Sequence, residues 1–101
     1  MNQEITIGLF GFGTVGQGVY RVITSAKNAH ASIRRVCVRN INKERDIETP
    51  HGLLTDDADD IFIAPEINLI VEVVDDASAS YRIVSTALKK GLPVVSGSKA
   101  M

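Results

Sequence analysis

A glycine-rich motif near the N-terminus constrains this chain more than any other feature. The pattern Gly-x-Gly-x-x-Gly spans Gly11–Gly16. It directly follows Ile5–Phe10, an almost continuously apolar run that is typical of a strand buried on both faces. It opens the segment Val15–Ile23, whose apolar residues recur at the spacing of one helix face. A strand, a glycine turn and a helix in this order are typical of the first unit of a dinucleotide-binding fold.

Each glycine of the motif has an expected steric role. Gly11 permits the tight turn out of the strand, Gly13 lets a pyrophosphate approach the backbone, and Gly16 lets the helix pack closely on the sheet. The free N–H groups at the start of the helix attract phosphate. The residues expected to line the loop through their backbone are Phe12, Thr14 and Val15. The motif predicts binding of NAD or NADP, and its spacing excludes a P-loop; a glycine turn without a ligand is the alternative.

The rest of the chain alternates between strand and helix patterns. Strands are predicted at Ile33–Val38, Leu69–Val74 and Pro93–Ser96, with Arg39–Pro50 as a loop. A short helix is expected through Ile61, capped from Thr55-Asp56-Asp57, and a longer helix between a cap at Asp76 or Ser78 and Gly91. This alternation predicts an α/β fold, a Rossmann-type doubly wound parallel sheet with strand order 2-1-3-4. We expect residues 1–101 to form one dinucleotide-binding domain, truncated at its C-terminus because a doubly wound fold would continue.

Composition narrows the class of protein. The formal net charge is −1, which gives no electrostatic case for nucleic acid. No stretch approaches the roughly 20 apolar residues that a membrane span needs. The single cysteine, Cys37, forms no internal disulfide, and we interpret it as a buried strand residue. The two histidines lack ligand spacing, so no metal site is predicted. We expect a cytoplasmic protein that binds neither nucleic acid nor membranes.

The end of the second predicted strand bears on the choice of cofactor. NAD-binding domains often carry an acidic residue there for the ribose hydroxyls. This chain has Arg39 instead, with Lys43 and Arg45 nearby. Arginine suits a 2′-phosphate, so NADP is favoured over NAD, and we assign Arg39 and Lys43 to the cofactor site. A solvated arginine is the alternative. A methyltransferase, which also has a glycine-rich first loop, would usually carry a carboxylate at this position.

Several segments together resemble the homoserine dehydrogenase family. They are Ile7–Val19, Val38–Asn40, Leu54–Asp57, Pro65–Asn68, Val71–Val74 and Gly91–Ala100, and they follow the family pattern in one register over nearly the whole chain. The last segment is similar to the family's Gly-x-x-Val-Val-Thr-Ala-Asn-Lys-Ala. The resemblance implies the NAD(P)-binding domain of an oxidoreductase that interconverts homoserine and aspartate semialdehyde by hydride transfer.

The resemblance also suggests roles for individual residues. Lys99 holds the place of the family's lysine near the active site, and we assign it to catalysis, with a helix-flanking lysine as the alternative. Ser96 and Ser98 replace the family's Thr and Asn, and we place them at the cofactor. Asp75-Asp76 stands where the family usually has glycines. We assign Asp75 to the cofactor site as a partner for a ribose hydroxyl, although a helix cap is the favoured interpretation of this pair.

Two other functions stay open at this point. One is a non-catalytic NAD(P)-binding sensor module, and the other is the cofactor domain of another amino-acid dehydrogenase. If the parent is a homoserine dehydrogenase, the remaining catalytic groups belong to a substrate domain, and the isolated chain is expected to bind nucleotide without turnover. An incomplete sheet exposes an edge and an apolar face, so a homodimer is a further expectation.

Overall fold

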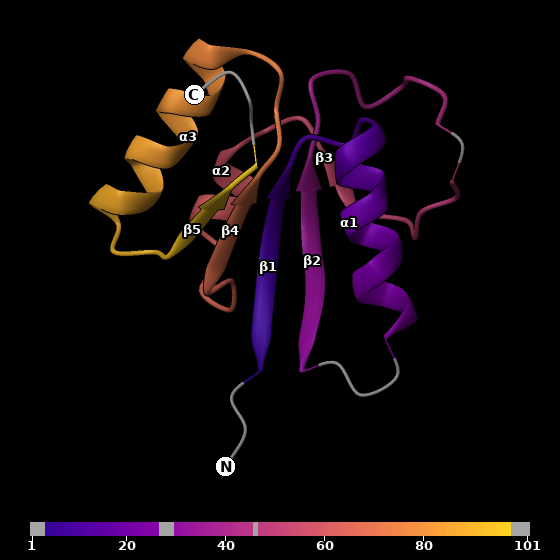
Figure 1. Ribbon diagram of the computed structural model, residues 1–101, viewed down its shortest axis with the longest axis horizontal. Coiled ribbons are helices and arrows are strands. Elements are labelled where there is room, and N and C mark those ends of the chain that lie inside the picture. Colours follow the sequence, from indigo (N-terminus) through magenta and orange to yellow (C-terminus); the bar gives the residue numbers. More distant parts are fainter. Residues whose placement is uncertain (1–3, 27–29, 46, 98–101) are drawn as a thin grey trace.

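The computed structural model describes residues 4–26, 30–45 and 47–97, and within them the chain forms one parallel sheet with helices on both faces (Figure 1). The elements in chain order are β1 (Ile5–Phe10), α1 (Thr14–Ser25), β2 (Ala31–Cys37), β3 (Leu54–Thr55), α2 (Asp59–Phe62), β4 (Leu69–Glu72), α3 (Ala77–Lys89) and β5 (Val94–Ser96). The strand order is β3-β2-β1-β4-β5. No helix among these residues has the length and apolarity needed to cross a membrane.

The predicted strand order is confirmed, with one strand added. The four strands expected from the sequence are β2, β1, β4 and β5 in that spatial order. The added strand is β3, which the sequence pattern does not predict and which pairs with the end of β2 through Val36↔Leu54 and Cys37↔Thr55. Two residues are too few to show the alternation that identifies a strand. The Rossmann-type α/β class therefore holds, and the sheet has one more edge strand than expected.

The start of α2 differs from the capping that the sequence suggested. Its N-cap residue is Ala58, which offers no side-chain cap. Instead Asp57 Oδ1 accepts the N–H of Asp59 at 2.9 Å, and the hydroxyl of Thr55 bonds to the carboxylate of Asp60. Thr55 is already part of β3, so it ties the edge strand to the helix rather than capping it. The prediction for α3 is confirmed, because Asp76 is its N-cap.

Alternating residues of the strands divide the core between the two faces of the sheet. Ile7 and Leu9 of β1 pack with Val36 on the face that α1 covers. Phe10 of β1 and Ile70 of β4 pack on the opposite face, beneath α2 and α3. Each such fully buried side chain contributes on the order of 1.5–3 kcal/mol of transfer free energy. Both faces of the central strands are therefore apolar, as the unbroken apolar runs predicted.

Glu72 is the exception, a fully buried carboxylate at the end of β4. Its Oε1 accepts the backbone N–H of Val74 at 2.9 Å. Its Oε2 accepts the hydroxyls of Ser80 on α3 and Ser96 on β5, both at 2.7 Å. A buried carboxylate is tolerated only when such donors satisfy it. Glu72 thus joins β4, α3, β5 and the loop that follows β4.

Three large apolar side chains are exposed on α3 and β5. Tyr81 and Leu88 of α3 are more than three-fifths exposed, and Val95 of β5 is 55% exposed. The homodimer expected from the sequence stays a prediction.

We expect Ser80→Ala to destabilise the fold through Glu72. The variant removes one donor from a buried carboxylate, which costs about 1–3 kcal/mol of unfolding free energy. Urea denaturation measures the loss. The matched control is Ser78→Ala, on the exposed part of the same helix, with an expected change within about 0.5 kcal/mol. Equal effects of the two substitutions would contradict this role for Glu72.

Candidate functional site

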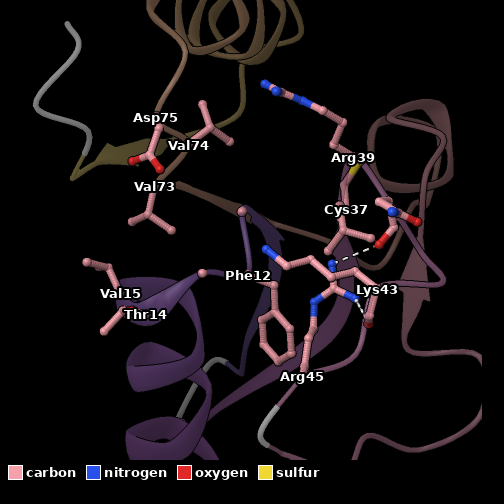
Figure 2. Close-up of a pocket in the computed structure, with 14 residues that line it drawn as sticks. Phe12, Thr14, Val15, Cys37, Arg39, Lys43, Arg45, Val73, Val74 and Asp75 are labelled. Atoms are coloured by element: carbon pink, nitrogen blue, oxygen red, sulfur yellow. Dashed lines mark hydrogen bonds between the residues drawn. The ribbon is translucent and has the colours of Figure 1, made fainter.

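A cleft of about 460 Å³ opens at the carboxyl ends of β1, β2 and β4 (Figure 2). Its floor is the glycine loop, and its sides are the segments that follow β2 and β4. In doubly wound sheets, ligands bind outside the carboxyl ends of the strands, next to the point where the strand order reverses. Here β1 lies between β2 and β4, so the cleft occupies that position.

The backbone of the glycine loop is held by both neighbouring strands. The backbone N–H of Gly11 donates to the carbonyl oxygen of Cys37 at 3.0 Å, and the backbone N–H of Val73 donates to the carbonyl oxygen of Phe10 at 2.9 Å. Gly11 has a φ of 101°, a conformation that favours glycine, and a Cβ there would lie 2.9 Å from the carbonyl oxygen of Val73. The loop is therefore fixed in position. Only glycine fits at its first position, because the backbone has a positive φ there and the carbonyl of Val73 leaves no room for a Cβ.

The other two motif glycines meet opposite environments. A Cβ at Gly16 would collide with the carbonyl oxygen of Gly11, so a side chain at Gly16 would push α1 away from the loop. A Cβ at Gly13 would meet nothing within 4 Å, because Gly13 lines the open cleft. Gly16 thus has the packing role that the sequence predicted. Gly13 leaves room for a ligand beside its backbone.

The start of α1 is suited to an anion. Gly13 is the N-cap and supplies no side-chain acceptor, and the first turn contains no acidic residue. The early N–H groups of a helix and its dipole together attract negative charge. The first turn itself therefore suits an anion, while Asp75 on the loop after β4 places one carboxylate on another side of the same cleft.

The sequence predicts that Phe12 lines the loop through its backbone, but its side chain also has a structural role. Its ring is buried in the core and meets Tyr20 edge-on at 5.7 Å between ring centroids. Its carbonyl oxygen accepts a hydrogen bond from the amide of Gln17 at 2.9 Å. The guanidinium of Arg45 lies 6.0 Å from the centroid of the same ring. Phe12 therefore packs the glycine loop against α1, and its ring lies beneath the guanidinium of Arg45 at the cleft.

Arg45 organises the loop after β2. Its guanidinium donates to the carbonyl oxygens of Lys43 and Asn40, both at 2.9 Å. The cleft is lined by Asn40, Lys43 and Arg45 together. The sequence showed Arg45 only as an additional charge. Neither its position over Phe12 nor its hydrogen bonds to the loop can be predicted from residue spacing in the sequence.

Arg39 lies apart from Lys43 and Arg45 and extends toward α3, as Figure 2 shows. Its Nη2 is 3.7 Å from Asp76 Oδ2, and its side chain is 82% exposed. Asp76 Oδ1 accepts the N–H groups of Ser78 and Ala79 at the start of α3. These backbone hydrogen bonds, with a smaller contribution from Arg39, hold the pKa of Asp76 below its ordinary value. The predicted cationic cluster is thus divided between two sides of the cleft.

The remaining predicted residues fall in three places. Thr14 and Val15 line the cleft, and so does Asp75 on the loop after β4. Ser96 lies at the end of β5, where its hydroxyl donates to Glu72. Ser98 and Lys99 lie outside the described residues. Within the described part, no group of three or more metal-ligating side chains is gathered.

Cys37 lies where the cleft meets a second hollow of about 310 Å³ on the α2 and α3 side. It is half-buried rather than fully buried. Burial raises the pKa of the thiol to about 11, and the nearby carboxylates of Asp56, Asp57 and Asp60 add to the shift. The thiol is therefore protonated at neutral pH, which does not suit a nucleophile.

Known proteins resemble this chain over almost its whole length. A family model described as "Homoserine dehydrogenase, NAD binding domain" matches residues 11–101. The homoserine dehydrogenases of Corynebacterium glutamicum and Methylobacillus glycogenes are 35% and 34% identical over 98% of the chain. The chain spans only 24% and 26% of those two proteins.

Solved structures give the same result. The crystal structure of S. aureus homoserine dehydrogenase at pH 7.0 superposes with a TM-score of 0.88 at 28% identity, covering 98% of this chain and 27% of that one. The homoserine dehydrogenase of Thiobacillus denitrificans superposes with a TM-score of 0.78 at 31% identity, covering 96% of this chain and 24% of that one.

Alanine substitutions at three glycines should separate packing from ligand access. We expect Gly16→Ala to lose about 1–3 kcal/mol of stability, because the added methyl overpacks the contact with Gly11. Gly13→Ala should lose nucleotide affinity and cost no more than about 1 kcal/mol of stability, because alanine is a poorer N-cap than glycine. Gly18→Ala lies inside α1 and its methyl meets nothing within 4 Å, so this control should leave affinity unchanged and raise stability by about 0.5–1 kcal/mol. Thermal melts with and without nucleotide measure both; unchanged affinity in Gly13→Ala would contradict the assignment of the loop.

Proposed function

The chain belongs to the homoserine dehydrogenase NAD-binding domain family, and on this premise we propose that it supplies the NADP site of an enzyme that interconverts homoserine and aspartate semialdehyde. The observation that carries the proposal is the open backbone at Gly13, beside a helix start free of acidic residues. The bound nicotinamide would accept or supply the hydride.

The glycine loop would hold the pyrophosphate. The backbone between Gly11 and Gly16 lines the cleft floor, and the helix dipole of α1 points toward it. The loop is tied to β2 through Gly11 and to β4 through Val73, so it would keep its shape when a ligand binds. Pre-organised N–H groups bind phosphate without a further ordering cost, which is the advantage of such a loop.

The charges around the cleft favour NADP over NAD. No carboxylate occurs between Val38 and Lys43, where an NAD-specific domain would carry one. The cations Arg39, Lys43 and Arg45 all line the cleft. A 2′-phosphate placed between Arg39 and Lys43 would gain charge-assisted hydrogen bonds that a ribose hydroxyl cannot match.

Lys99 and the serines near it would complete the site. We propose that Lys99 handles the proton of the reacting alcohol or orients the substrate, in keeping with the family's lysine. Ser96 and Ser98 would contact the cofactor, and Asp75, which lines the cleft, would accept a ribose hydroxyl. Ser96 already donates to Glu72, so the end of β5 is held in place beside β4.

We expect Arg39→Ala to weaken NADP binding about tenfold or more and to change NAD binding less than about twofold, as charge-assisted contacts to a phosphate predict. Fluorescence or calorimetric titration with both nucleotides measures this. Arg34→Ala is the matched control, because Arg34 is an exposed arginine of β2, the strand that precedes Arg39, and its partner is Glu66. Tighter binding of NAD than of NADP by the unaltered chain would refute the NADP assignment.

The 101-residue chain alone is expected to bind nucleotide without turnover. It spans about a quarter of its relatives, and the proposal assigns the remaining catalytic groups to a substrate domain. The assay is NADP reduction by homoserine, followed by absorbance of the reduced nicotinamide. A full-length relative is the positive control, and turnover by the isolated chain at the relative's rate would disprove the division of roles.

A further inference from the structure

The carboxylate of Asp76 has two partners at once. Its Oδ1 caps α3 by accepting the N–H groups of Ser78 at 2.8 Å and Ala79 at 3.2 Å. Its Oδ2 lies 3.7 Å from Nη2 of Arg39, across the gap between the β4 and β2 ends. The two backbone hydrogen bonds fix the orientation of the carboxylate, so Oδ2 stays directed toward Arg39. The pairing is thus built into the helix cap.

Arg39 has no other carboxylate partner within 4.0 Å among the described residues. It borders both the main cleft and the second hollow on the α3 side. Figure 2 shows it directed away from Lys43 and Arg45, the other cations of the cleft. The position of its guanidinium therefore depends on Asp76 rather than on those two residues.

We propose that Asp76 sets how strongly the chain discriminates NADP from NAD, by drawing Arg39 toward α3 and offsetting its charge. The inference rests on the proposed function, because it concerns the same cofactor cleft. A 2′-phosphate attracted to Arg39 also meets the negative charge of Asp76, which a neutral ribose hydroxyl does not. Asp76 therefore weakens NADP binding selectively.

The carboxylate is ionised under ordinary assay conditions. The backbone N–H groups of Ala79 and Ser78 lower its pKa, and the charges of Arg39 and Arg82 lower it further. The discrimination is consequently a fixed property of the chain near neutral pH. It places one determinant of cofactor choice at the start of α3, on the opposite side of the cleft from the end of β2.

The experiment uses Asp76→Asn in the 101-residue chain, with NAD and NADP titrated separately at low ionic strength. Asparagine caps helices as well as aspartate does, so the variant removes the charge and keeps the cap. We expect the Kd for NADP to fall about two- to fivefold, the upper part of the range for one exposed charge contact. The Kd for NAD should change less than about twofold, and the gain for NADP should shrink at high salt.

Two further variants sharpen the comparison. Glu66→Gln is the matched control, because it removes the carboxylate partner of another exposed arginine, Arg34 of β2. It should alter neither Kd. Adding Arg39→Ala to Asp76→Asn should abolish most of the gain, because the two residues act together. If the melting temperature shows that Asp76→Asn is unfolded, Asp76→Ser replaces it, since serine is also a good N-cap.

The outcomes separate this inference from the proposed function. If the unaltered chain binds both nucleotides and Asp76→Asn leaves the ratio of the two dissociation constants unchanged, the proposed role of Asp76 is wrong. The proposed cofactor site is not affected by that result. An unaltered chain that binds neither nucleotide overturns the proposed function itself. A selective gain for NADP that disappears without Arg39 supports both.

Discussion

The contact between Gly16 and the carbonyl of Gly11 determines where α1 lies. Because Gly16 has no side chain, the first turn of the helix lies directly on the loop that leaves β1. The first helical N–H groups then face the cleft rather than the solvent beyond it. Val73, at the end of β4, closes the other side of Gly11. The position of the helix start beside the cleft therefore follows from one backbone contact that excludes a Cβ.

Glu72 has a comparable role for the far side of the sheet. Helix α3 packs on the sheet through Ala87 and Ile83, and β5 is an edge strand of three residues. The hydroxyls of Ser80 and Ser96 tie both elements to one buried carboxylate. Its bond to the N–H of Val74 shapes the loop that leads to Asp76. A single polar group thus fixes both the segment after β4 and the end of β5.

The sequence predicted the parts of this structure that depend on local pattern. Apolar runs identified β1, β2, β4 and β5, and the doubly wound pattern of alternating strands and helices placed them in the correct order. The glycine spacing identified the loop. The short strand β3 was missed because two residues show no period, and it is held mainly by its pairing with Val36 and Cys37.

The arrangement of the cations could not be predicted in the same way. Arg39, Lys43 and Arg45 are close in sequence, so proximity suggested one cluster. In the fold, Arg45 lies over the ring of Phe12 and bonds the loop backbone, whereas Arg39 reaches α3. The contacts of Arg45 with Phe12 and of Arg39 with Asp76 each join residues more than 30 positions apart, so sequence periodicity cannot predict them. The same is true of Glu72, which appeared in the sequence only as one charge in an apolar strand.

Under the proposed function, the separation of Arg39 from Lys43 would let one cleft favour NADP without a dedicated phosphate pocket. Lys43 and Arg45 keep positive charge on the glycine-loop side, where Phe12 supports Arg45. Arg39 is exposed and its only partner among the described residues is an exposed carboxylate, so water and salt weaken that pair. A 2′-phosphate carries more charge than Asp76 and can compete for the same guanidinium. Discrimination then depends on the difference between two weak interactions, which one substitution at the α3 cap can shift.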